Sequence, residues 1–112
     1  MKRKVTAKIK SMLKNFGLDA ECINIIMTFI KKAEKEKISW ADVNLQKDMY
    51  EPVSKTSNYS AGTLQRRLSK NITLCWQSSK RNVIYKTLGL EVKPTPKILV
   101  QAILLGIENN KF

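Results

Sequence analysis

Apolar residues recur at intervals of three and four along most of the chain, which is the period of an amphipathic α-helix. The first stripe comprises Val5, Ile9, Met12, Leu13 and Phe16. Gly17 follows it, and glycine readily adopts the left-handed conformation that ends many helices. We therefore expect a first helix that finishes at Gly17.

A second apolar stripe follows directly and comprises Ile23, Ile26, Met27, Ile30 and Ala33. Asp19 precedes it as a capping residue, and Glu21 lies in the first turn, where negative charge suits the helix dipole. This pattern predicts a helix from about Ala20 to Lys37, whose last turns form a solvated charged end.

The segment 44–57 is predicted to be a short helix that is interrupted near Pro52. Proline is best tolerated in the first turn of a helix. A break at Tyr50–Glu51 therefore costs less free energy than a continuous helix with Pro52 in its interior. Pro52 to Thr56 would then be the first helix of a helix-turn-helix, with Ser57 to Tyr59 as its turn.

The longest regular stripe begins after Ser60, a strong capping candidate. It comprises Leu64, Leu68, Ile72, Cys75 and Trp76. At about 100° per residue these side chains share one face, which predicts a helix from Ala61 to about Ser78.

Two more helices are expected near the end of the chain. A short helix should finish at Gly89, followed by a brief extended stretch from Leu90 to Val92. Thr95 can cap the last helix, with Pro96 at its first position. That helix is apolar on much of its surface, so a central core position and a dimer contact both remain open. The whole pattern predicts an all-α fold: a compact bundle of about six helices containing a helix-turn-helix, in one domain spanning residues 1–112.

Charge adds a candidate partner to this picture. Of the 112 residues, 21 are Lys or Arg and nine are Asp or Glu, which gives a formal net charge of +12. Such a field attracts polyanions, of which nucleic acid is the commonest in a cytoplasm. Hydrophobic residues make up 43% of the chain, so it has enough apolar material to fold.

The sequence gives little indication of an enzyme or of a metal site. The chain has no histidine, and we see neither a phosphate-cradling glycine loop nor a paired-carboxylate site. Asp42 and Asp48 are interpreted as surface or cap features, and Cys22 and Cys75 as buried free thiols in a reducing compartment. We expect no enzyme activity, no metal and no cofactor.

Targeting signals are also missing from the sequence. No apolar run is long enough to cross a membrane, and the basic opening from Met1 to Lys4 leads into polar sequence without a secretory core. We therefore expect a cytoplasmic protein.

The non-core side of the helix 61–78 carries the candidate DNA-binding residues. It presents small, polar and basic residues, and no acidic residue occurs between Glu51 and Glu91. A helix fits the major groove of B-DNA, where Arg can pair with guanine and Gln with adenine. We assign backbone contacts to Lys55, Ser60, Thr63, Arg67, Lys70, Lys80 and Arg81. The plainer interpretation is an ordinary solvated basic face.

From Met49 onward the sequence resembles the C-terminal effector domain of the master sporulation response regulator of endospore-forming bacteria. The block from Tyr50 to Trp76 and the block Lys93-Pro94-Thr95 carry the resemblance, and the segment from Ile9 to Gly17 fits the first effector helix. The resemblance implies a bundle of about six helices that binds short promoter boxes, often as tandem copies.

In that family the base-reading side chains correspond here to Gln65, Arg66 and Ser69. Arg66 matches in type, whereas Gln65 stands in place of an acidic residue and Ser69 in place of an arginine. The resemblance also implies a homodimer on tandem sites and contact with an RNA polymerase sigma subunit near Ser79–Leu88. The receiver domain of the family is absent, which leaves an excised effector domain and a stand-alone protein as alternatives.

Two other functions remain open. The chain could be a protein-interaction module that pairs with a full-length regulator through its apolar last helix and modulates it. RNA binding is a third alternative, although aromatic residues that could stack on bases are few and no RRM-like strands are predicted.

Overall fold

Six α-helices make up most of the computed structural model, which describes residues 3–112; Met1 and Lys2 of the basic opening lie outside the described residues. The helices are α1 (Arg3–Asn15), α2 (Ala20–Glu36), α3 (Glu51–Thr56), α4 (Ala61–Gln77), α5 (Arg81–Leu88) and α6 (Pro96–Glu108). A 3₁₀ turn, η1 (Trp40–Asp42), and a π-helical turn, η2 (Gln46–Tyr50), lie between α2 and α3. Residues 3–112 contain no strand, so the predicted all-α bundle is confirmed.

Short polar side chains fix the first residues of three helices, as the sequence predicts. Each has extended backbone and accepts a hydrogen bond from the backbone N–H three residues further on, a donor that the helix itself cannot satisfy. The pairs are Asp19 with Cys22, Ser60 with Thr63, and Thr95 with Ile98.

The ends of two helices are set by glycines in the left-handed region. Gly17 (φ 89°) follows α1, and Gly89 (φ 72°) follows α5. Gly17 also lies against the far end of α4, because a Cβ added to it would be 3.4 Å from both Cys75 Sγ and Lys80 Cγ. A side chain at this position would therefore strain the backbone and would also be crowded by Cys75 and Lys80.

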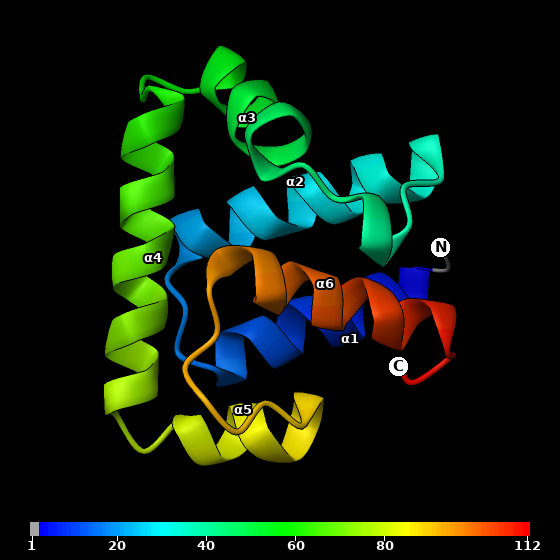
Figure 1. The fold of residues 1–112 in the computed structure, drawn as a ribbon, viewed down its shortest axis with the longest axis vertical. Coiled ribbons are helices and arrows are strands. Elements are labelled where there is room, and N and C mark those ends of the chain that lie inside the picture. Colours follow the sequence, from blue (N-terminus) through cyan, green and yellow to red (C-terminus); the bar gives the residue numbers. More distant parts are fainter. Residues whose placement is uncertain (1–2) are drawn as a thin grey trace.

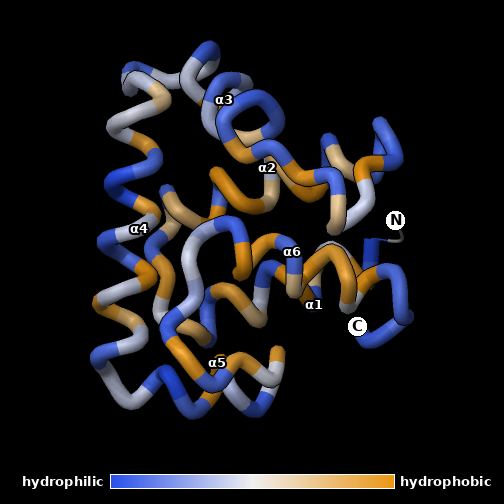
Figure 2. Tube along the Cα trace, in the orientation of Figure 1, coloured by the Kyte–Doolittle hydropathy of each residue, from blue (hydrophilic) through white to orange (hydrophobic). Residues whose placement is uncertain are grey.

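Helix α4 stands along one edge of the molecule. Figure 1 shows α4 upright beside the ends of α1, α2 and α6, with α3 at its upper end and α5 at its lower end, and α2 packs against both α1 and α6. Hydrophilic and hydrophobic positions alternate along α4 (Figure 2), so one side of the helix joins the body and the other does not.

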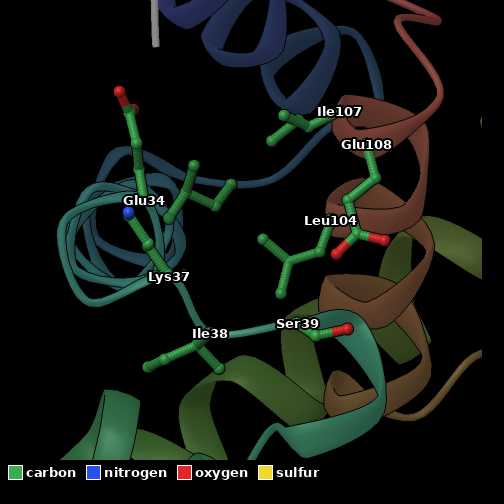
Figure 3. Close-up of a pocket in the computed structure, with 9 residues that line it drawn as sticks. Glu34, Lys37, Ile38, Ser39, Leu104, Ile107 and Glu108 are labelled. Atoms are coloured by element: carbon green, nitrogen blue, oxygen red, sulfur yellow. The ribbon is translucent and has the colours of Figure 1, made fainter.

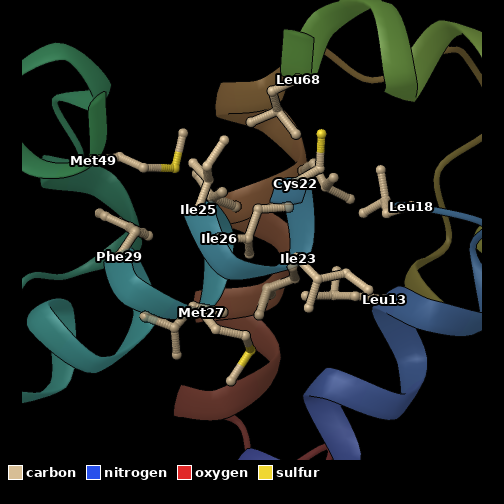
Figure 4. Packing of buried hydrophobic residues seen from close by; sticks show 14 of the residues in the cluster. Leu13, Leu18, Cys22, Ile23, Ile25, Ile26, Met27, Phe29, Met49 and Leu68 are labelled. Carbon is tan, nitrogen blue, oxygen red and sulfur yellow. The ribbon is translucent and has the colours of Figure 1, made fainter. Parts of the chain in front are cut away.

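One continuous core connects α4 to the rest of the fold. Figure 4 shows Met49 and Leu68 converging on Cys22 and Ile25 of α2. The largest side chains that are almost completely buried are Phe16, Phe29, Ile9, Leu13, Ile25, Ile26, Ile30, Met49, Leu64, Leu68, Leu99 and Ile103. Leu64 and Leu68 hold α4 in place as expected, while Trp76 is half-buried against the same core.

The expected break at Tyr50–Glu51 is wrong. Both residues have right-handed helical backbone, and the Glu51 N–H donates to the carbonyl oxygen of Gln46, five residues earlier. The ring of Pro52 would collide with the carbonyl four residues before it in a regular α-helix, and the wider π turn relieves this conflict. The chain therefore stays helical from η2 into α3.

Helix α6 lies mainly in the core, which is one of the two positions that the sequence left open. Leu99, Val100, Ile103 and Leu104 are buried, whereas Ile98 and Leu105 remain 45% and 39% exposed. Within residues 3–112, no helix has both the length and the apolar character needed to span a bilayer.

Candidate nucleic-acid interface

The outer side of α4 consists of three rows of residues spaced one helical turn apart. Residues four positions apart lie above one another on a helix. We name these rows by their first members: the Gln65 row (Gln65, Ser69, Thr73), the Arg66 row (Arg66, Lys70 and the exposed Leu74) and the Arg67 row (Arg67, Asn71). The buried row of Leu64, Leu68 and Ile72 lies on the side that faces the core.

The Arg66 row points furthest away from the core and is exposed. The Arg66 guanidinium donates to Thr63 Oγ1 at 3.3 Å and lies 3.7 Å from where a Cβ on Gly62 would be. It therefore reaches back over the first turn of α4, the part of a recognition helix that normally contacts base edges. Neither Arg66 nor Lys70 forms an ion pair with any residue in the range 3–112.

The Arg67 row faces α2 and is tied to it. Arg67 Nη1 lies 2.8 Å from both carboxylate oxygens of Glu21, and its guanidinium stacks 4.1 Å from the centre of the Tyr59 ring. One turn further on, Asn71 Oδ1 accepts the backbone N–H of Asp19 at 2.9 Å. These contacts join α4 to the start of α2 and to the turn before α4.

The Gln65 row ends beside a lysine from another segment. Gln65 is exposed and Ser69 is half-buried. Thr73 Oγ1 donates to the Ser69 carbonyl oxygen at 3.0 Å and accepts from Lys93 Nζ at 3.3 Å. The loop before α6 thus places a cation next to the C-terminal half of α4.

Exposed cations also lie at both ends of α4. Lys55 is in α3, before the turn Ser57–Ser60, while Lys80 and Arg81 follow the last turn of α4. A helix of 17 residues is about 25 Å long, so these cations flank a surface of that length. Helical segment, short turn and long helix occur in the order that the sequence predicts for a helix-turn-helix.

The structure therefore separates the residues that the sequence grouped together. Gln65, Arg66, Ser69 and Lys70 share the outward side, whereas Arg67 turns toward α2. Ser60 and Thr63 lie at the first turn, where Ser60 Oγ accepts from the Thr63 N–H and donates to Thr63 Oγ1 at 3.0 Å.

Sequence reasoning missed Lys93, Tyr59 and Glu21 as parts of this surface. In the sequence, Lys93 stands in the block leading into the last helix, and nothing in the local pattern shows that this block passes Thr73. The Arg67–Glu21 pair joins residues 46 positions apart. A helical wheel of α4 alone cannot reveal such a partner.

The two cysteines offer no reactive site. Cys22 and Cys75 are free and buried, as predicted. Burial, reinforced by the nearby Asp19 carboxylate, raises the pKa of Cys22 to about 12, and burial also raises the pKa of Cys75. Both thiols therefore stay protonated near neutral pH, where a nucleophile would need the thiolate.

Asp48 serves a structural role just before α3. Asp48 is buried and Asp48 Oδ2 accepts the backbone N–H of Asn44 at 3.0 Å, while Asn44 Oδ1 accepts the N–H of Lys47 at 3.1 Å. This reciprocal arrangement caps the helical segment that contains η2. Asp48 is therefore a cap but not a solvated surface residue, and within residues 3–112 no three Cys, Asp or Glu side chains cluster to hold a metal.

A separate pocket of about 270 Å³ lies between the C-terminal ends of α2 and α6 (Figure 3). Ile30, Ile38, Leu104 and Ile107 contribute its apolar walls, and Glu34, Lys37 and Glu108 lie around it. It is at the opposite end of α2 from the α4 contacts, so it is not part of the interface described above.

No protein-family model, curated protein or solved structure matches this chain. The fold and the surface define it as an all-α protein that displays a cationic helix along one edge.

Proposed function

We propose that this protein binds duplex DNA sequence-specifically and regulates transcription, with α3 and α4 as a helix-turn-helix and α4 in the major groove. The observation that carries the proposal is the exposed Arg66 row, in which Arg66 reaches over the first turn of α4 and has no acidic partner among residues 3–112. The major groove is about 12 Å wide and admits one helix. Arg66, Gln65 and Ser69 are the proposed base contacts.

Charge supports this function. The net charge of +12 favours association with a polyanion, and the cations at both ends of α4 are placed to contact phosphates. No acidic residue occurs between Glu51 and Glu91, so nothing within this segment repels the DNA backbone.

The resemblance to the sporulation regulator's effector domain points the same way. On that basis we propose that the protein binds promoter boxes as tandem copies and that α5, within Ser79–Leu88, contacts an RNA polymerase sigma subunit. Free buried cysteines fit a reducing compartment, so we place this activity in the cytoplasm.

Substitution of Arg66 tests the proposal directly. A target box is first selected from a random pool of duplexes, and affinities for this box and for random duplex are compared. Arg66→Ala should lower the specific-to-random ratio by about 5- to 150-fold, because one bidentate base contact is worth about 1–3 kcal/mol of discrimination. An unchanged ratio would mean that Arg66 does not read bases.

Two control variants separate charge from readout. Lys80→Ala should weaken binding to both duplexes by the same factor, because a phosphate contact carries no direct sequence information. Lys35→Ala removes an equal charge from the last turn of α2, away from α4, and should leave the ratio unchanged. Competition with duplex RNA tests the RNA-binding alternative, which predicts that RNA displaces DNA.

The second candidate function is a protein-interaction module that modulates a full-length regulator. The observation that favours it is the exposure of Ile98 and Leu105, which lie about two turns apart on one side of α6. Light scattering with and without DNA distinguishes the two functions. A stable complex with such a regulator, together with no DNA affinity, would favour this second candidate.

A further inference from the structure

Two cations lie on opposite sides of the Arg66 row, and their surroundings differ. Arg67 and Thr73, the contact of Lys93, are six residues apart, which places them about 120° apart around the axis of α4. Arg66 and Lys70 point outward between them. A duplex seated on the Arg66 row would therefore have one of these cations on each side.

The positive charge of Arg67 is already paired with a carboxylate. Arg67 Nη1 lies 2.8 Å from both oxygens of Glu21, and the guanidinium covers the ring of Tyr59. A phosphate approaching Arg67 would meet the Glu21 carboxylate as well, so attraction and repulsion would largely cancel. Moving Arg67 to a phosphate would also leave Glu21 without its partner.

The positive charge of Lys93 has no carboxylate partner among residues 3–112. Its ammonium has three donors, and one of them goes to the neutral Thr73 hydroxyl at 3.3 Å. Among residues 3–112, no carboxylate pairs with Lys93. Two donors and a full positive charge are therefore left at the end of the Gln65 row.

We propose that Lys93, held beside α4 by Thr73, is a phosphate-binding site for one DNA strand, and that Arg67 is a positioning residue that contacts no phosphate. The inference rests on the proposed DNA-binding function and assigns different tasks to the two cations. Of the two cations that flank the Arg66 row, only Lys93 then contacts the DNA backbone.

Arg67 positions α4 by joining three elements. Glu21 is in the first turn of α2, Tyr59 is in the turn before α4, and Asn71, in the same row as Arg67, holds the N–H of Asp19. A helix tied along one row cannot rotate freely about its axis. The Arg67 row therefore sets which side chains of α4 reach base edges.

The salt dependence of DNA binding separates the two tasks. Each phosphate contact contributes about 0.9 to the slope of the logarithm of the binding constant against the logarithm of salt concentration. Lys93→Ala should reduce the slope by about 0.9 and weaken binding to the selected box and to random duplex equally, and Lys93→Arg should restore both. Arg67→Ala should leave the slope unchanged and lower the specific-to-random ratio.

Arg67→Lys keeps the charge but loses the planar fork and the stacking on Tyr59. A phosphate contact at Arg67 would be rescued by lysine, whereas a positioning residue would not, so Arg67→Lys should lower the ratio as Arg67→Ala does. Glu21→Gln should lower it as well, and Glu21→Gln combined with Arg67→Ala should be no worse than Arg67→Ala alone, since both act through one pair. Circular dichroism melting checks that each variant is folded.

The outcomes are distinct. If the wild-type protein bound neither duplex, the proposed function and this site would both be overturned. If it bound, the inference alone would be overturned by a reduced slope in Arg67→Ala, by rescue of the ratio in Arg67→Lys, or by an unchanged slope in Lys93→Ala. Lys35→Ala, which removes a charge away from α4, should leave the slope unchanged and serves as the control.

Discussion

The hydroxyl of Tyr50 is a polar group in a buried position. Tyr50 is 2% exposed, and its Oη has no hydrogen-bond partner among residues 3–112. An unsatisfied buried donor costs about 1–3 kcal/mol. Tyr50→Phe should therefore increase the free energy of unfolding by about 1 kcal/mol, measured by urea denaturation. A clear loss of stability would contradict this expectation.

Alkaline pH should destabilise the protein through two buried acids. Burial raises the pKa of Cys22 from 9.0 to about 12 and that of Tyr50 from 10.0 to about 12. Between these values the unfolded chain has lost protons that the folded protein retains, so the free energy of unfolding falls as pH rises above about 9. Below that pH the two groups are protonated in both states and add no slope.

Urea denaturation between pH 7 and pH 11 measures this effect. Tyr50→Phe removes one of the two groups, so its stability should fall less steeply than that of the wild type above about pH 10. Equal slopes for the two proteins would rule out a contribution from Tyr50.

Residue-level features were predictable where the determinant is local. Asp19, Ser60 and Thr95 act as caps because each needs only a backbone N–H three residues away. The partner of Arg67 was not predictable, because Glu21 approaches it only through the packing of α2 on α4. Lys93 reaches α4 for the same kind of reason.

At the scale of elements, the first turn of α4 links stability to the proposed DNA readout. Ser60 caps α4 through Thr63, and Thr63 Oγ1 in turn accepts from Arg66. Ser60→Ala should lower the free energy of unfolding by about 0.5–2 kcal/mol, the usual cost of losing such a cap. It should also lower specific DNA binding, because the fraying first turn carries the Arg66 contact.

Thr95→Ala is the matched control, since Thr95 caps α6 in the same way. It should cost a similar amount of stability and leave the specific-to-random ratio intact. Thermal unfolding and the two binding measurements compare the variants. If both lost specificity equally, general destabilisation would explain the effect of Ser60→Ala.

The helix before α4 shows where pattern analysis fails. Local rules place a break beside Pro52, but Met49 and Tyr50 are buried against the core and keep the chain helical. The π turn accommodates the proline without a break, and its occurrence depends on packing that no local rule includes. The long stripes that became α2 and α4 were predicted well, because their periodicity extends over several turns.

At the scale of the whole molecule, the distribution of charge determines how the proposed DNA binding should respond to salt. Five cations are proposed to contact phosphates: Lys55, Lys70, Lys80, Arg81 and Lys93. The slope of the logarithm of the binding constant against the logarithm of salt concentration should then be about −4.5 on random duplex. A sixth contact at Arg67 would make it about one unit steeper, and fluorescence anisotropy titrations from 50 to 300 mM salt distinguish the two values.

Net charge and helix count could be predicted from the sequence, but the position of each cation could not. The value of +12 is a sum over side chains, whereas the edge location of α4 follows from how α2, α5 and α6 pack against it. The candidate surface was therefore predicted as a helix face, and its flanking residues emerged only from the fold.

The hydrogen bond from the Asp19 backbone N–H to Asn71 Oδ1 has a practical consequence. That amide belongs to the residue before α2, yet its N–H donates to Asn71 Oδ1 of α4, with 2.9 Å between nitrogen and oxygen. Exchange of this amide with deuterium requires the hydrogen bond to open, so one backbone signal outside α4 reports how often the contact between α4 and the start of α2 breaks. The stiffness of the docking of α4 can thus be measured without placing a label on the surface that would meet DNA.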